Sequence, residues 1–167
     1  MSVQRAEKID SGQVWDLLAT VHDPEIPVLS VLDLGIVRDV KTDGGRLEVV
    51  ITPTYSGCPA MNTIETDIES VLVEAGYDNA VITTVLAPAW TTDWLSDEGR
   101  KKLKAYGIAP PTGTSANKRA LFSTVYVRCP RCGSKETECV SEFGSTPCKS
   151  LYRCTICAEP FDYFKCI

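Results

Sequence analysis

Two pairs of cysteines, each pair separated by two residues, are the side chains in this sequence best suited to chemistry. They are Cys129 with Cys132 and Cys154 with Cys157, and 21 residues lie between the two pairs. Two residues between thiolates let a tight turn direct both sulfur atoms at one ion. Two such turns complete a tetrahedral site of four sulfurs, which suits zinc. The spacing therefore predicts a closed structural zinc site.

Other chemistry competes with zinc at these pairs. A redox site needs only one such pair and usually lies at the start of a helix, which disfavours that interpretation. A cysteine-bound iron–sulfur cluster stays open, because four-sulfur spacing alone does not distinguish iron from zinc. Strands predicted at 121–127 and 151–153 precede the two pairs, as in a zinc ribbon. A module of about 40 residues has too small a core to fold unaided, so we expect the metal to supply folding energy.

Four further cysteines lie outside these pairs. Cys58 is predicted at the N-cap of a helix, where unpaired N–H groups favour a thiolate that can bind metal or attack an electrophile. The alternative is a cap residue that only packs. Cys148 lies in a turn of small residues that could expose its thiol beside Lys149, so it is a candidate reactive or cluster-binding residue. The alternative for Cys148 is a small buried apolar residue, which is also what we expect of Cys139, and Cys166 is unassigned.

Three polar residues of the N-terminal half could support such a thiol. Thr54 could supply a hydroxyl group. Asp23 and Glu25 are either solvated turn residues or a pair that orients a ligand or tunes the thiol. His22 is the only histidine, which excludes a His-rich metal site. Because no nucleotide-binding glycine loop and no convincing acid–base pair is present, we expect an accessory protein rather than an enzyme.

Hydrophobic periodicity and turn residues predict the elements that would position these side chains. The expected order is helix 11–22, strands 36–41 and 46–52, helix 59–75, strand 80–86 and helix 96–106. This order predicts an α+β fold, a small mixed sheet with helices packed on it, followed by a small all-β zinc ribbon. The expected domains are 1–107 and 121–167, joined by a linker at 108–120.

Composition narrows the class of protein. The chain has 167 residues and a net charge of −5, which argues against a general nucleic-acid-binding protein. No apolar run approaches the roughly 18 residues of a membrane helix. The first residues have mixed charge and no apolar core, so we expect no secretory signal and a cytoplasmic protein. A cytosolic compartment also favours metal sites over structural disulfides.

Two longer motifs resemble known families. Asp23-Pro24-Glu25-Ile26-Pro27 and Thr54-Tyr55-Ser56-Gly57-Cys58-Pro59 resemble the domain of iron–sulfur assembly factors of the SufT type. The segment Ala87-Pro88-Ala89-Trp90, together with Phe143-Gly144-Ser145-Thr146 and Glu159-Pro160-Phe161-Asp162, is similar to the PaaD (PaaJ) family. That family accompanies the multicomponent phenylacetyl-CoA epoxidase of aerobic phenylacetate degradation, and the likeness covers nearly the whole chain except the linker.

The resemblance implies a function as well as a fold. It implies a bacterial accessory protein that assists iron–sulfur cluster assembly or delivery to the epoxidase system, with the ferredoxin-type reductase as partner. The residues tied to that work would be Cys58 and Glu25, with a transient cluster held across a homodimer because one cysteine cannot hold a cluster alone. The alternative is a non-catalytic structural subunit of the oxygenase. The resemblance also implies that the four paired cysteines bind structural zinc.

Overall fold

The computed structural model describes residues 9–112 and 126–165. The chain divides into two compact units, Met1–Trp90 and Thr91–Ile167, and each is described by itself. The sequence pattern predicts helix 96–106 in the first domain and a linker that begins at residue 108. In the structure both the helix and Ile108–Ala109 belong to the second unit, because Ile108–Ala109 is a strand that pairs there. Among the described residues, no helix is long and apolar enough to cross a membrane.

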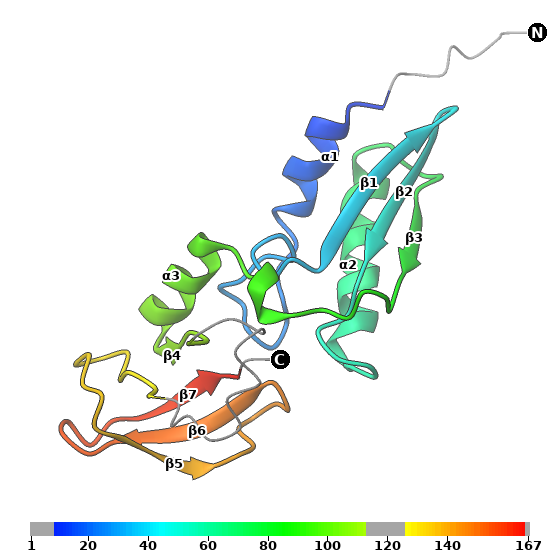
Figure 1. Ribbon diagram of the computed structural model, residues 1–167. Helices are drawn as coiled ribbons and strands as arrows, with labels where there is room; N and C mark the ends of the chain where they lie inside the picture. Colours follow the sequence, from blue (N-terminus) through cyan, green and yellow to red (C-terminus); the bar gives the residue numbers. More distant parts are fainter. Residues whose placement is uncertain (1–8, 113–125, 166–167) are drawn as a thin grey trace, which may run out of the picture. The chain divides into compact units, whose positions relative to one another are not determined.

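The first unit is a three-stranded sheet with two helices (Figure 1). Its elements are α1 (Ser11–Leu18), β1 (Val37–Asp43), β2 (Arg46–Ile51), α2 (Ala60–Glu74) and β3 (Val81–Thr84). The strand order is β1-β2-β3, with β1 antiparallel and β3 parallel to β2. The parallel pair follows from the crossover through α2, and the predicted mixed sheet with its order of elements is confirmed.

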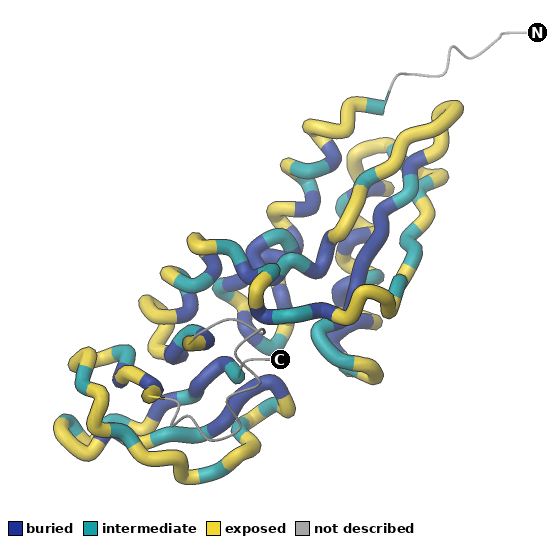
Figure 2. The backbone as a smooth tube through the Cα atoms, viewed as in Figure 1, coloured by how far each residue is buried: buried dark blue, intermediate teal, exposed yellow. Residues whose placement is uncertain are grey.

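Apolar side chains from the sheet and from both helices form the core of this unit. Figure 2 shows the buried positions along the backbone in dark blue. On β2 the fully buried residues alternate, and on α2 they recur every three or four positions. The core residues of these elements are Val14, Leu18, Leu47, Val49, Ile51, Ile64, Ile68 and Leu72.

The helix α1 ends at Leu18, four residues earlier than predicted. The N–H groups of Thr20 and Val21 donate to the carbonyl groups of Leu17 and Leu18, at 3.0 and 3.1 Å, so the chain leaves the helix through a tight turn. The Thr20 hydroxyl also donates to the Leu17 carbonyl. A hydroxyl that competes for a helical carbonyl weakens the helix ahead of the proline at position 24.

The second unit contains a four-stranded sheet. Its elements are η1 (Thr92–Trp94), α3 (Asp97–Tyr106), β4 (Ile108–Ala109), β5 (Thr137–Ser141), β6 (Lys149–Cys154) and β7 (Pro160–Phe164). The strand order is β4-β7-β6-β5, in which only the β4–β7 pair is parallel. Tyr126 and Val127, the described part of the strand predicted at 121–127, are not in a strand.

Candidate metal centre and the Cys58 loop

The four paired cysteines come together in the second unit. The sulfur atoms of Cys129 and Cys157 lie 3.7 Å apart, those of Cys132 and Cys154 lie 3.6 Å apart, and all four lie within 4.8 Å of one another. A tetrahedral zinc ion with zinc–sulfur bonds of about 2.3 Å requires sulfur–sulfur distances of about 3.8 Å. The donor set and its geometry therefore fit zinc, held by these four side chains.

Two similar backbone turns hold the four sulfur atoms. In each turn the first cysteine donates its N–H to a carbonyl five residues later, at 2.9 Å, from Cys129 to Ser134 and from Cys154 to Glu159. The residue after the second cysteine has a left-handed backbone in both turns, with φ +74° at Gly133 and +60° at Ala158. Such turns direct backbone N–H groups at sulfur, which stabilises thiolates.

The electrostatics of the cluster favour a bound cation. Backbone N–H groups of Cys157 and then Ile156 lower the pKa of Cys154 to about 7. The pKa of Cys157 rises to about 12, because burial and the neighbouring thiols outweigh the N–H of Glu159. Thiolates this close repel one another, so they cannot all ionise together unless a cation lies between them. The guanidinium of Arg131 pairs with the Glu159 carboxylate and thereby links the two turns.

The expected burial of Cys139 is wrong, and Cys148 takes the buried one of its two alternatives. Cys139 is exposed, since it lies on the edge strand β5, and its thiol contacts the Glu142 carboxylate at 3.7 Å. Partial burial, followed by the charge of Glu142, raises the pKa of Cys139. Cys148 is only 6% exposed, and its sulfur lies 3.0 Å from the Thr146 hydroxyl.

The cation expected beside Cys148 has a different partner. The Lys149 ammonium lies 3.7 Å from the Asp162 carboxylate, and the Lys149 side chain is buried. Cys148 lies in the turn immediately before β6. Cys148 is therefore outside the group of four sulfurs, and Cys166 lies outside the described residues.

Cys58 lies one residue before the N-cap of α2, which is Pro59 and not Cys58 as predicted. The residue is half-buried. Its N–H donates to the Tyr55 carbonyl and its carbonyl accepts from the Met61 N–H, both at 3.2 Å. Gly57 supplies a left-handed backbone, φ +80°, immediately before it. The backbone of Cys58 is thus held in a short turn while its side chain keeps access to solvent.

Asp23 shapes a turn of its own rather than lying free in solvent. One of its carboxylate oxygens accepts the N–H groups of Glu25 and Ile26, at 2.7 and 2.8 Å, and the residue is 8% exposed. Glu25 and Thr54 are half-buried. The Thr52 N–H donates to the Ile36 carbonyl at 2.9 Å, so the segment after Asp23 and the loop before Cys58 meet the sheet at the same end (Figure 1).

Two residues at this end of the sheet were not singled out as contributors to the site. Trp90 is buried, and its indole N–H donates to the Leu34 carbonyl at 2.8 Å. This hydrogen bond links the segment after β3 to the segment before β1. The hydroxyl of Thr52 is buried with no hydrogen-bond partner among the described residues. The signal available was a polar residue directly after the apolar run Val49, Val50 and Ile51.

Known proteins resemble each part of the chain. Residues 12–82 match the family described as iron–sulfur cluster assembly protein, and residues 113–165 match the zinc β-ribbon domain of PaaD. A protein of Porphyromonas gingivalis described as an Fe-S protein maturation auxiliary factor is 35% identical over 89 residues, 52% of this chain and 84% of its own.

Solved structures share the fold of the first part. A domain of unknown function from Bacillus anthracis has 26% identity and a TM-score of 0.52, over 55% of this chain and 89% of that one. A conserved hypothetical protein from Thermotoga maritima has 30% identity and a TM-score of 0.50, over 62% and 98%.

One relative matches along nearly the whole chain. It is an Escherichia coli (strain K12) protein described as a subunit of a "Putative 1,2-phenylacetyl-CoA epoxidase". The two chains are 48% identical over 155 residues, which cover 93% of this chain and 92% of the relative. The matched region includes both structural units and both predicted family motifs, so this chain belongs to the PaaD family.

Proposed function

We propose that this chain is an accessory protein of aerobic phenylacetate degradation. It assists the assembly of an iron–sulfur cluster, or its delivery to the phenylacetyl-CoA epoxidase system, and the ferredoxin-type reductase is the recipient. The observation that carries the proposal is the half-buried Cys58 in the part of the chain that matches iron–sulfur cluster assembly proteins. The description of the E. coli relative supports the link to the phenylacetyl-CoA epoxidase, and that of the P. gingivalis relative supports the role in iron–sulfur maturation.

The cluster is cargo in this proposal, and Cys58 is its ligand. One thiolate cannot hold a cluster alone, so the remaining ligands come from a second copy of the chain or from the recipient. Delivery is then a ligand exchange, in which the bond from Cys58 to iron breaks as a recipient thiolate binds the same iron. No oxidation or reduction is needed. Asp23 holds the turn that carries Glu25, so the backbone of Glu25 is fixed for the supporting role proposed for it.

The metal centre has a different role in the proposal. Its four ligands fill a tetrahedral site and two of them, Cys129 and Cys154, are fully buried. A closed site of this kind stabilises a fold and leaves no open position for exchange. Cys148 is buried as well, so the proposal does not use it as a second transfer ligand.

The test measures cluster content in the recipient. Reductase is purified anaerobically from cells that carry the wild-type chain, no chain, Cys58→Ser or Cys139→Ser, and its iron and sulfide are quantified. Cys139 is the matched control because it is another accessible cysteine of the same chain. We expect cluster-poor reductase without the chain and with Cys58→Ser, and full clusters with Cys139→Ser. Full clusters in cells without the chain would refute the proposal.

A second candidate function is a non-catalytic structural subunit of the oxygenase. The description of the E. coli relative as a subunit favours it. This candidate predicts stable co-purification with the oxygenase components. It also predicts that Cys58→Ser changes neither this co-purification nor the cluster content of the reductase. Loss of cluster from the reductase with intact co-purification of the components would exclude it as the sole function.

A further inference from the structure

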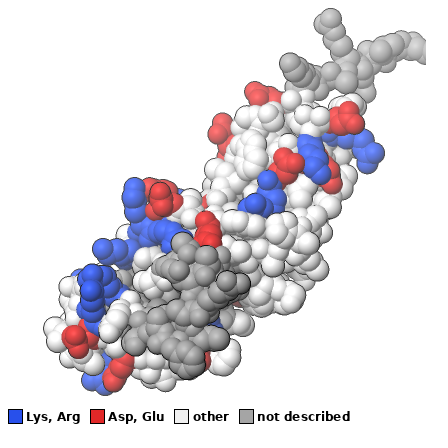
Figure 3. Space-filling model, viewed as in Figure 1, with Lys and Arg blue, Asp and Glu red and all other residues white. Residues whose placement is uncertain are grey.

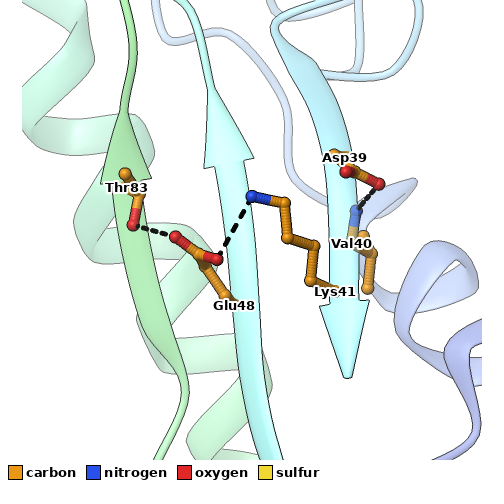
Figure 4. Close-up of polar contacts among 5 residues, drawn as sticks. All are labelled: Asp39, Val40, Lys41, Glu48 and Thr83. Atoms are coloured by element: carbon orange, nitrogen blue, oxygen red, sulfur yellow. Dashed lines mark hydrogen bonds and ion pairs between the residues drawn. The ribbon is translucent and has the colours of Figure 1, made fainter. Parts of the chain in front are cut away.

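The two edges of the first unit's sheet differ in how they are protected against added strands. The edge strand β1 carries alternating charged side chains and a bulge between Val37 and Asp39. Its Lys41 reaches the Glu48 carboxylate of β2, which also accepts from the Thr83 hydroxyl (Figure 4). Figure 3 shows side chains of both signs over this hairpin. Charges and bulges are the devices by which proteins block edge pairing.

The opposite edge strand, β3, has none of these devices. Its sequence, Val81 to Thr84, contains no charge and no proline, and its pairing with β2 is regular. The Val85 N–H donates to the Ile51 carbonyl at 2.9 Å, so the alternate residues Ile82 and Thr84 direct their backbone N–H and carbonyl groups away from β2. Among the described residues no strand pairs with this edge.

A pocket of about 370 Å³ lies beside this open edge, between α2 and β3. It is lined by Asn62, Glu65, Thr66, Glu69, Ala80 and Ile82. Its only ionisable side chains are two carboxylates, and one of them accepts a hydrogen bond from the Thr84 hydroxyl at 2.9 Å. The sequence has no Lys or Arg between Arg46 and Arg100, so no nearby cation along the chain neutralises this pocket.

We propose that β3 and this pocket form a docking site for an extended, basic segment of a partner protein. The segment adds a strand to β3 through the backbone groups of Ile82 and Thr84, as in other cases of strand addition. Every second side chain of the added strand then points toward α2. An Arg or Lys at such a position packs its aliphatic stem along Ile82 and places its charge near Glu65 and Glu69.

The charge of the site selects this occupant over a second copy of the chain. Pairing β3 with the β3 of another copy would bring two acidic pockets toward each other, and like charges across an interface oppose association. A basic segment gains both the backbone hydrogen bonds and the attraction to two carboxylates. The proposal does not depend on the proposed cluster chemistry, since it uses no residue of the Cys58 loop or of the metal centre.

The test uses two capped seven-residue peptides on the zinc-loaded full chain. One alternates arginine with valine, and the other has glutamate in place of arginine. We expect the arginine peptide to bind, to weaken as salt is raised, and to slow amide hydrogen exchange at Ile82 and Thr84, while the glutamate peptide does not bind. Glu69→Lys should weaken binding about fivefold. Asp67→Lys makes the same charge change on α2 outside the pocket and should have a smaller effect.

Three results would overturn the proposal. Equal weakening by Glu69→Lys and Asp67→Lys would mean that the peptide responds only to overall charge. Unchanged exchange at Ile82 and Thr84 would mean that no strand is added at the edge. Slowed exchange at both residues in the peptide-free protein, together with a dimer in sedimentation, would assign the edge to a second copy.

Discussion

The left-handed residue that follows each cysteine pair offers a direct test of how the metal centre is built. Gly133 has φ +74°, and a Cβ added there would meet no atom within 4 Å, so Gly133→Ala would introduce conformational strain without a clash. That strain is about 1 to 2 kcal/mol for an L-residue, offset in part by the lower entropy of the unfolded chain. We therefore expect a net loss of about 1 kcal/mol, or about fivefold in zinc affinity, because metal binding and folding are coupled.

Ala158 already has a left-handed backbone, φ +60°, so Ala158→Gly should change zinc affinity by a similar factor in the opposite direction. The assay is competition for zinc with a chromophoric chelator, followed by circular dichroism of the chelated protein. The double variant should return close to wild-type affinity, since the residues lie in separate turns. An unchanged zinc affinity in Gly133→Ala, or a lower zinc affinity in Ala158→Gly, would contradict the assigned backbone geometry.

Three further predictions concern other parts of the chain. Cys132→Ser should abolish stoichiometric zinc binding, measured by metal analysis, and unfold the second unit. Cys139→Ser should leave zinc binding and folding intact, because Cys132 is one of the four clustered cysteines and Cys139 is not. The Thr83 hydroxyl lowers the pKa of Glu48 below its usual 4.5, so this pair stabilises the fold above that value and the stabilisation is lost as pH falls through the lowered pKa. Urea unfolding across this acid range should show a smaller pH dependence for Thr83→Val. Gly57→Ala should cost about 1 kcal/mol in thermal unfolding and change the rate at which the adjacent cysteine reacts with a thiol reagent, because its φ is +80°.

Elements specified by nearby residues could be predicted from the sequence. The helix α3 begins at a Ser96 cap whose hydroxyl accepts the Gly99 N–H, and it ends at Gly107 with φ +94°. The hairpin of β1 and β2 turns at Gly44 and Gly45, between the two strands predicted at 36–41 and 46–52. Caps and glycine turns act within a few residues, so the sequence pattern contains the whole of the signal.

Features set by distant pairing could not be predicted in the same way. The strand β4 exists because Ile108 and Ala109 pair with Asp162 and Tyr163, more than fifty positions later in the chain. Two residues are too few to show a strand period, and the segment from Pro110 onward, rich in Pro, Thr and Gly, has the composition of a linker. The exposure of Cys139 also depends on strand order, since this residue lies on the edge strand β5. Neither order nor register is encoded in the local composition around a cysteine.

The metal centre and the Cys58 loop call for opposite physical properties, and the structure separates them in two units. A centre that stabilises a fold must keep its metal, and four thiolates in a closed tetrahedron with two fully buried ligands do so. A ligand that passes a cluster onward must release it, which favours a single thiol with access to solvent and no competing protein ligands. Cys58 has that access, so it is the cysteine proposed for ligand exchange. The four clustered cysteines have the properties of a site that stabilises the second unit.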